Sequence, residues 1–367
     1  MKLDKLSTLL LFLFTSSCFQ TDTIIRGTGA IKLKESSFED LPNWNTENHR
    51  TSLLSFLNSC KKIAKLPQSR SIGGQIGNIT AADFRDVCEI GEVVKGLSDR
   101  QVTNFFQNWF KPYLVMDRDN EEVGLFTGYY EASLNGSRTK SSKYKYPLYK
   151  RPVDLNGEAY LTRKEIENGA LKGKNLEILY VDDPVELFFM HVQGSGRVKL
   201  PSGAVLRVAY DAKNNQPFIP ISTYLLDNEF LTKREISAQN IKNWLKENPE
   251  VAVEAMNSNP SFIFFRISKK ERIVGGQGVE LIKEKSLAVD KEIIPYGLPL
   301  WVNTTVKGKK FNSLMIAQDT GSAIKGTVRG DIFFGYGKEA EDNASSLSSR
   351  GTYHALLPRN IVMKLAK

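Results

Sequence analysis

Short runs of β-forming residues, separated by glycine, dominate the chain from residue 123 to residue 212 and again after residue 273. These runs are rich in aromatic and β-branched residues, which fit the pleated surface of a sheet. The chain is therefore restricted to folds in which many short strands pair. The runs are GLFTGYY, YKYPLYK, LEILYV, VELFFMHVQG and VLRVAY, then FIFFRI at 262–267, then SLAVD, IIPYGLPLWV, SLMIAQD, DIFFGYG and ALLP.

Helical periodicity is concentrated in residues 50–112 and 219–256. Apolar residues fall on one face between residues 51 and 64, and capping-box patterns occur at Thr80 and at Ser98. The second capping box precedes an apolar stripe that ends before Pro112. We therefore expect an α+β protein that is mainly β, with a helical N-terminal layer.

The N-terminus has the pattern of an export signal. Lys2 and Lys5 precede the apolar run LLLFLF, which is too short to span a bilayer. The following Ser-Ser-Cys resembles the lipobox of bacterial lipoproteins, although Thr15 stands where leucine is usual. We expect residues 1–18 to be a signal with lipidation at Cys18, and plain cleavage nearby is the alternative.

Export would place the remaining chain in an oxidising compartment. The polar, Thr- and Ser-rich residues 19–38 predict a tether. Cys60 and Cys88 both lie on apolar helix faces, and an oxidising compartment favours their pairing in a disulfide. Two buried free thiols are the alternative.

Several functional classes lack their sequence signals. The net charge of +9 favours anionic partners, but no run of five cations occurs, so we expect no nucleic-acid partner. The three histidines show no metal-ligand spacing, so we expect no metal. Neither the GYGKEA segment nor any other stretch fits a dinucleotide or phosphate loop, so we expect no cofactor. Ser195, in Gly-Ser-Gly, lacks the GxSxG context of a nucleophile.

Two carboxylates offer the remaining chemistry. The stretch QDTGSAIKGTVRGDIFFG contains Asp319 and Asp331, twelve residues apart, each next to an apolar run. A carboxylate at a strand end beside apolar side chains is partly dehydrated, which raises its pKa and suits a general acid. The alternative is that Asp319 caps a turn and Asp331 lies at a solvated strand edge.

Tyrosines gather in the middle β region, where their flat faces and polar tips would suit sugars. The alternative is that they occupy ordinary sheet surface, where tyrosine is favoured. These tyrosines are Tyr129, Tyr130, Tyr144, Tyr146, Tyr149 and Tyr210.

Six motifs together resemble those of the membrane-bound lytic murein transglycosylase A family. The resemblance begins near residue 120 and extends to the C-terminus, with the motifs in the same order. They are FTGYYEASLNGSR, YPLYKRP, HVQGSGRVKLPSG, NPSFIFFR, LAVDKEIIPYGLPLWV and QDTGSAIKGTVRGDIFFGYG.

The resemblance implies a fold of two β domains. A double-psi β-barrel domain would be split in sequence into residues 39–119, which are helical, and residues 269–367. A second β-barrel domain, residues 120–268, would be inserted between these parts. A groove between the domains would hold the glycan.

The resemblance also implies an activity: cleavage of the β-1,4 bond between N-acetylmuramic acid and N-acetylglucosamine in peptidoglycan, leaving 1,6-anhydro ends. Asp331 matches the catalytic aspartate and Asp319 the supporting one. The protein would be a periplasmic monomer, anchored by lipid to the outer membrane of a Gram-negative bacterium and able to join cell-wall enzyme complexes. The residues expected to bind substrate are Tyr129, Tyr130, Glu131, Gln193, Gly194, Ser195, Gly196, Lys325 and Gly326.

Two other functions stay open from the sequence. An inverting glycan hydrolase would use Asp319 and Asp331 as an acid and base pair and would consume one water for each cut. A non-catalytic murein-binding protein would bind glycan without releasing fragments.

Overall fold

The computed structural model describes residues 24–269 and 272–365. The described chain is a mixed α+β protein built on a 14-stranded sheet. The export signal, Cys18 and the first residues of the expected tether lie outside the described residues. Within the described ranges, no helix has the length and apolar character needed to cross a bilayer.

The N-terminal segment supplies a small antiparallel unit and three helices. Its elements are β1 (Ile24–Arg26), β2 (Lys32–Glu35), η1 (Phe38–Asp40), η2 (Trp44–Thr46), α1 (Arg50–Ile63), η3 (Ala81–Phe84), α2 (Arg85–Val94), α3 (Asp99–Trp109) and β3 (Phe110–Met116). The capping boxes expected at Thr80 and Ser98 are both present.

The middle segment carries five strands after the long strand β4, and most of the remaining helices. Its elements are β4 (Gly124–Ser137), β5 (Tyr146–Tyr149), α4 (Arg163–Glu165), η4 (Ile166–Ala170), β6 (Glu177–Val181), α5 (Pro184–Gln193), β7 (Ser195–Lys199), β8 (Val205–Lys213), α6 (Ile221–Asp227), α7 (Ala238–Glu247), α8 (Pro249–Asn257) and β9 (Ile263–Ile267).

The C-terminal segment is mostly strand. Its elements are β10 (Ser286–Ala288), β11 (Pro299–Val306), β12 (Lys309–Asp319), β13 (Arg329–Tyr336), α9 (Lys338–Ser346), β14 (Ser348–Pro358) and α10 (Arg359–Leu365).

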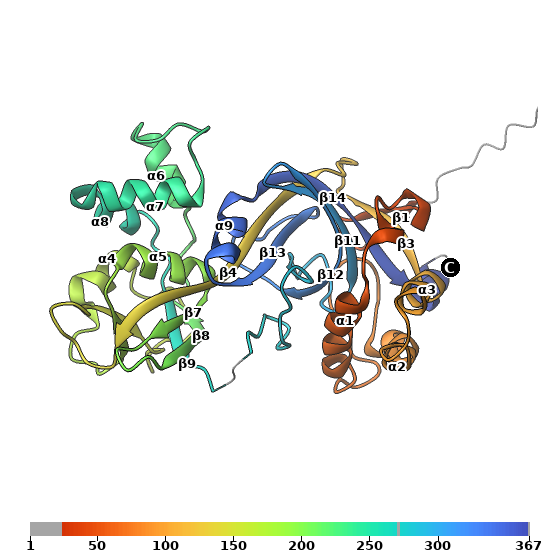
Figure 1. The fold of residues 1–367 in the computed structure, drawn as a ribbon, viewed down its shortest axis with the longest axis horizontal. Helices are drawn as coiled ribbons and strands as arrows, with labels where there is room; N and C mark the ends of the chain where they lie inside the picture. Colours follow the sequence, from red (N-terminus) through yellow and green to blue (C-terminus); the bar gives the residue numbers. More distant parts are fainter. Residues whose placement is uncertain (1–23, 270–271, 366–367) are drawn as a thin grey trace, which may run out of the picture.

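Six strands close into a ring, which we call the barrel lobe together with α9 and the N-terminal helices that cover it. The strands pair in the order β4, β13, β10, β12, β11 and β14, and β14 pairs back with β4. Figure 1 shows this lobe beside a second lobe, made of β5–β9 and α4–α8. The first half of β4 pairs with β13 and β14, and its second half pairs with β7 and β6. Both lobes therefore share one strand.

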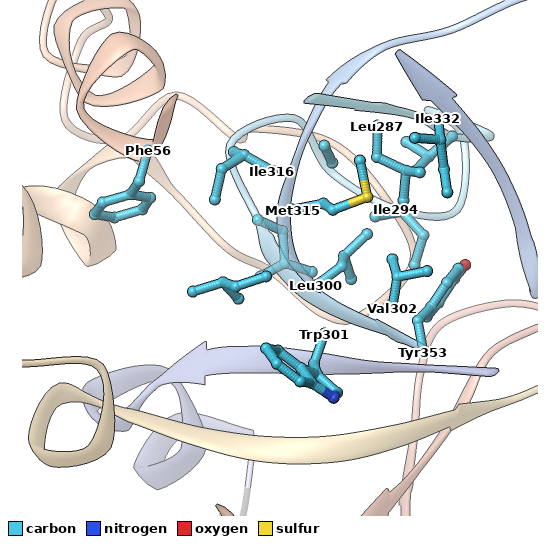
Figure 2. Close-up of a cluster of buried hydrophobic side chains, with 14 of the residues drawn as sticks. Phe56, Leu287, Ile294, Leu300, Trp301, Val302, Met315, Ile316, Ile332 and Tyr353 are labelled. Atoms are coloured by element: carbon cyan, nitrogen blue, oxygen red, sulfur yellow. The ribbon is translucent and has the colours of Figure 1, made fainter. Parts of the chain in front are cut away.

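Alternating side chains fill the barrel lobe. Leu300 and Val302 of β11 lie with Met315 of β12 in the interior (Figure 2), all fully buried. Trp301, between the two β11 residues, points to the opposite side of its strand. There its ring lies 5.0 Å from the ring of Trp44. The N-terminal segment thus seals the outside of the same strand.

Helix α1 is attached to the barrel by hydrogen bonds as well as by apolar packing. Ser52, Ser55 and Ser59 are fully buried along one stripe of the helix. Ser52 donates to the Leu314 carbonyl at 2.7 Å. The Gln318 side chain accepts from Ser55 at 2.9 Å and donates to Ser59 at 2.8 Å. These bonds fix the helix against β12 immediately before Asp319.

Three sequence-based expectations are wrong. Residues 184–193 form helix α5 and not a strand, because Asp183 caps the helix by accepting from two backbone amides and Gly194 ends it at positive φ. Residues 24–38 contain β1 and β2 in place of a tether, since β2 pairs with β3 and buries Leu33. The N-terminal layer is less helical than expected, because Phe110–Met116 pairs with β14 as β3.

The structure joins Cys60 of α1 to Cys88 of α2 in a disulfide, with their Cα atoms 5.5 Å apart. The bond closes a loop of 28 residues. It secures the helical layer that holds α1 on the barrel.

We expect the double substitution Cys60→Ala and Cys88→Ala to lower the free energy of unfolding by about 3 to 4 kcal/mol, because the cross-link restricts the unfolded chain. Urea unfolding of the oxidised protein and the double variant measures this difference. Wild-type protein kept under reducing conditions is the control and should unfold like the double variant. Equal stability of the oxidised protein and the variant would contradict the expectation.

Candidate active site

The two aspartates lie on either side of the same short strand. Asp319, the last residue of β12, pairs with Ala288 of β10, and Ala288 pairs on its other side with Asp331 of β13. Asp331 in turn pairs with Thr127 of β4. Because neighbouring strands lie about 4.8 Å apart, the Cα atoms of the two aspartates are about 10 Å apart. The loop between the two aspartates therefore brings Asp331 back to the same level of the sheet as Asp319, on the other side of β10.

Asp331 is a partly buried carboxyl with few hydrogen-bond donors. Its Oδ1 accepts from the Thr127 hydroxyl at 2.6 Å, the one hydrogen bond it receives from the described residues. Arg329 donates to the same hydroxyl at 2.8 Å. Burial raises the pKa of Asp331 to about 6, and the negative charge of Asp319 adds to the rise. The Thr127 bond and the Arg329 charge oppose it.

Asp319 is held much more tightly. Its Oδ1 accepts from the backbone amides of Gly276 at 2.8 Å and Thr320 at 2.9 Å, and its Oδ2 accepts from the Tyr129 hydroxyl at 2.7 Å. Burial raises the pKa of this carboxyl, and the three donors oppose that rise. Its orientation is therefore fixed by groups from three separate segments.

Tyr129 donates a hydrogen bond to Asp319 and lies on the strand that pairs with Asp331. Its ring lies 5.1 Å from the ring of Phe333, the β13 residue with which it pairs, and its hydroxyl reaches Asp319. Burial and the two aspartate charges raise the pKa of the hydroxyl, so it stays a hydrogen-bond donor. Thr127 and Tyr129 are two residues apart on β4 and so lie on one face. This face of β4 therefore points toward both aspartates.

This arrangement suits proton transfer by one residue. A carboxyl with a pKa near 6 is partly protonated at neutral pH and can act as an acid and then as a base. The second carboxylate, fixed by three donors, supplies a negative charge in a defined place. Among the described residues, no group of three or more His, Cys, Asp or Glu side chains is placed to hold a metal ion.

Two protein-family models match the chain. The MltA specific insert domain matches residues 125–266, and the 3D domain matches residues 285–357. The crystal structure of a membrane-bound lytic murein transglycosylase from Agrobacterium tumefaciens superposes with a TM-score of 0.82 and 32% identity, covering 92% of this chain and 100% of that one.

The chain belongs to the membrane-bound lytic murein transglycosylase A family.

Curated relatives agree with this family. The Vibrio cholerae protein named membrane-bound lytic murein transglycosylase A is 34% identical over 60% of this chain, and the match spans 62% of that protein's length, which is less than two thirds. The Buchnera aphidicola homolog is 28% identical, over 92% of this chain and 91% of its own length.

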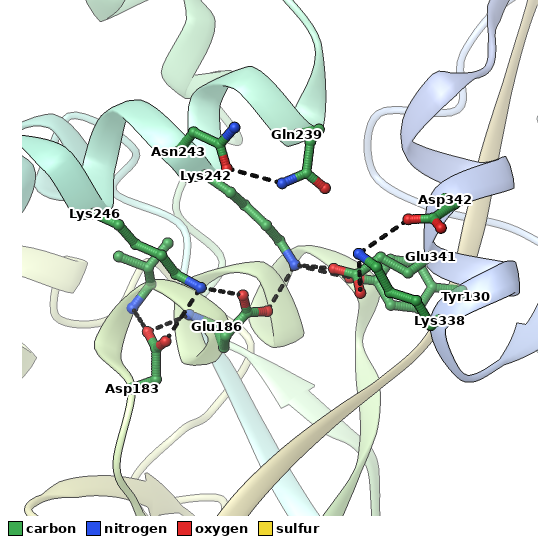
Figure 3. Close-up of polar contacts among 11 residues, drawn as sticks. Tyr130, Asp183, Glu186, Gln239, Lys242, Asn243, Lys246, Lys338, Glu341 and Asp342 are labelled. Carbon is green, nitrogen blue, oxygen red and sulfur yellow. Dashed lines mark hydrogen bonds and ion pairs between the residues drawn. The ribbon is translucent and has the colours of Figure 1, made fainter.

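Tyr130 lies on the opposite side of β4 from Tyr129. Its hydroxyl lies 3.1 Å from Glu341 and accepts from Lys242 at 3.0 Å. The buried Lys242 also pairs with Glu186 and Glu341, each at 2.6 Å. Figure 3 shows this cation between α5 of the second lobe and α9 of the barrel lobe. Tyr130 therefore belongs to the contact between the lobes and not to the aspartate pair.

The other expected substrate-binding residues divide into two sets. In the first set, the fully buried Glu131 forms ion pairs with two arginines. The Gln193 side chain accepts a hydrogen bond from the Tyr130 amide at 3.0 Å, and β7 pairs with β4, so residues 193–196 lie beside the second half of β4. Lys325 and Gly326 instead contact Asp290, at 3.4 and 3.1 Å. In the described structure, neither set forms a hydrogen bond or ion pair with the side chain of Asp319 or Asp331.

Three residues of the site were missed from the sequence: Thr127, Arg329 and Gly276. The first two lie inside motifs already quoted, but hydroxyl and guanidinium side chains near a carboxylate carry no sequence signal of their own. Gly276 lies in the pair Gly275-Gly276, where a side chain at Gly276 would meet the Tyr296 hydroxyl at 2.5 Å. A double glycine was the available signal.

Asp331 should make folding depend on pH. Its folded pKa of about 6 lies above the unfolded value of about 3.9, so the folded state binds the proton more tightly. The stability that this provides is complete below about pH 4 and declines as the pH rises to about 6. As the pH is raised from 4 to 7, wild type loses this stability and Asp331→Asn does not. We therefore expect the free energy of unfolding of Asp331→Asn, relative to that of wild type, to increase by about 1 to 2 kcal/mol over this range.

Urea unfolding at both pH values measures that gain. Asp227→Asn, which replaces an exposed aspartate at the end of α6, is the control. A gain that is the same for both variants would refute the assignment of the raised pKa to Asp331.

Proposed function

We propose that this protein cleaves the β-1,4 bond between N-acetylmuramic acid and N-acetylglucosamine in peptidoglycan and leaves 1,6-anhydromuramoyl ends. The proposal rests on one observation: the partly buried Asp331, with a pKa raised to about 6, lies within the segment that matches the 3D domain. The names of the relatives support the substrate, since each is called a murein transglycosylase.

Asp331 would act twice in each cycle. Protonated, it gives its proton to the glycosidic oxygen as the bond to C1 of the muramoyl residue breaks. The carboxylate then takes the proton of the C6 hydroxyl, whose oxygen bonds to C1 and closes the anhydro ring. No water is consumed, and the intramolecular attack gains from proximity. Thr127 would orient the carboxyl throughout, because its hydroxyl donates to Oδ1.

Asp319 would stabilise positive charge. The transition state of glycoside cleavage resembles an oxocarbenium ion, and a fixed negative charge on the same face favours it. Because both oxygens of Asp319 already accept hydrogen bonds, this carboxylate is poorly suited to activate a water molecule. That favours one acid and base residue over the inverting pair.

The architecture of the family supports a matching division of the chain. We propose that residues 269–367 together with residues 39–119 form a double-psi barrel domain, and that residues 120–268 form an inserted β-barrel domain. The closed ring of six strands and the insert-domain match at 125–266 support this division. The glycan would lie along the face of β4 that carries Thr127 and Tyr129.

The test is a product analysis. Wild-type protein should release muropeptides with anhydro ends from sacculi, and Asp331→Asn should lose at least about a hundredfold in rate, because the group that transfers the proton is gone. Mass spectrometry separates an anhydro end from a hydrolysed end, which is one water heavier. Asp342→Asn, on the exposed side of α9, is the control and should keep the wild-type rate.

Each alternative predicts a different product or variant. Hydrolysed ends, with Asp319→Asn and Asp331→Asn equally inactive, would favour the inverting hydrolase. Glycan binding without any fragments, unchanged in Asp331→Asn, would favour the binding protein.

We further propose that the protein is a monomeric lipoprotein of the outer membrane, facing the periplasm and acylated at Cys18. The relatives named membrane-bound support a place in the envelope. Labelling of cells with a fatty-acid probe should mark the wild-type protein and not the Cys18→Ala variant. Labelling that persists in the variant would disprove acylation at this cysteine.

A further inference from the structure

Tyr336 is an exposed aromatic residue at the junction of the two lobes. It ends β13, and 61% of its surface is accessible to solvent. Gly335 and Gly337, on either side, both have φ of +90°, which side-chain-bearing residues rarely adopt. A bulge in β13 lies between Phe333 and Tyr336. The backbone is thus shaped to present this one ring at the surface.

Tyr336 lies on the same face of the sheet as the aspartates. Its partner on β4 is Glu131, which follows Thr127 and Tyr129 at alternate positions of that strand. The paired residues of β13 are Asp331, Phe333 and Tyr336. Because of the bulge, the partners of Asp331 and Tyr336 are only four residues apart on β4. At about 3.3 Å per residue, Tyr336 therefore lies about 13 Å along the sheet from Asp331.

A guanidinium holds the Tyr336 ring. The Arg197 guanidinium of the second lobe lies 3.8 Å from the ring centroid. Arg197 is itself fixed by the buried Glu131, at 2.5 Å, and Glu131 also pairs with Arg207 at 2.5 Å. A cation against one face of an aromatic ring restricts its rotation and leaves the other face open to a ligand.

We propose that Tyr336 is a stacking platform for a sugar ring of the glycan strand, several sugars away from the bond that is cut. This inference rests on the proposed function. Aromatic faces suit the apolar faces of sugar rings, while hydroxyls around the ring remain hydrated. Tyr336 would contribute to the binding of long strands. It would make no contact with short fragments that occupy only the positions next to Asp331. It therefore makes the enzyme prefer long glycan over short glycan.

A structural role for the same ring predicts a different pattern. If Tyr336 only shields the pair between Arg197 and Glu131 from water, its loss would weaken the fold or change every substrate equally. Dependence on the length of the glycan belongs to the platform alone.

The experiment compares glycan strands separated by length, from one disaccharide repeat upward. For Tyr336→Ala we expect KM for long strands to rise about tenfold, which corresponds to about 1.4 kcal/mol of lost binding, with kcat and the kinetics of the shortest cleavable strand unchanged. Tyr336→Phe keeps the ring and should behave as wild type. Phe230→Ala, which removes another exposed aromatic ring from the segment after α6, is the control.

Two measurements complete the test. Urea unfolding of each variant reports any loss of stability. Affinity for long strands, measured with Asp331→Asn and with the same variant also carrying Tyr336→Ala, reports binding without turnover. Equal KM changes at every length, or none, in an active protein would overturn the platform and leave the proposed function intact. If wild-type protein releases no anhydro ends from any strand, the proposed function itself fails.

Discussion

The pairing of β10 on both of its edges determines where the chemistry can occur. This strand has only three residues, Ser286–Ala288, and it pairs with β12 in parallel and with β13 antiparallel. The position of each aspartate is therefore determined by its register with Ala288 rather than by the loop between the two aspartates. A slip of one residue in either register would turn a carboxylate to the other side of the sheet.

A buried amide makes that register hard to change. Gln318 immediately precedes Asp319 and is fully buried. Its side-chain oxygen accepts from Ser55 and from Ser286 of β10, and its nitrogen donates to Ser59 and to the Ser55 carbonyl. Because every bond is made, the amide is stable where it lies, whereas displacement would leave several polar groups unsatisfied in an apolar interior. Through Gln318, helix α1 thereby fixes the register of β12 against β10.

Sequence patterns were sufficient for features with a local cause. The strands that contain Asp319 and Asp331 were predicted, because the apolar residues and glycines that indicate them are neighbours in the sequence. The run at 184–193 was misjudged, since apolar residues dominate it and its caps are what distinguish a helix from a strand. Two adjacent candidates, Tyr129 and Tyr130, could not be ranked, because the direction that each side chain takes depends on pairings with residues about two hundred positions away.

The contact between the lobes was beyond sequence analysis for the same reason. The three groups around Lys242 come from β4, α5 and α9, and nothing local in any of these segments points to the others.

The shared strand β4 has a consequence for how the chain acquires its structure. Thr127 bonds to a residue 204 positions later, so the ring around the site cannot close until nearly the whole polypeptide is present. Folds dominated by such distant pairings form slowly, because the loop entropy is lost before the contacts form. Removing β4 would open the ring of the barrel lobe and take away the strand with which β6 and β7 pair. Because both lobes need β4, neither lobe is expected to fold fully without the other.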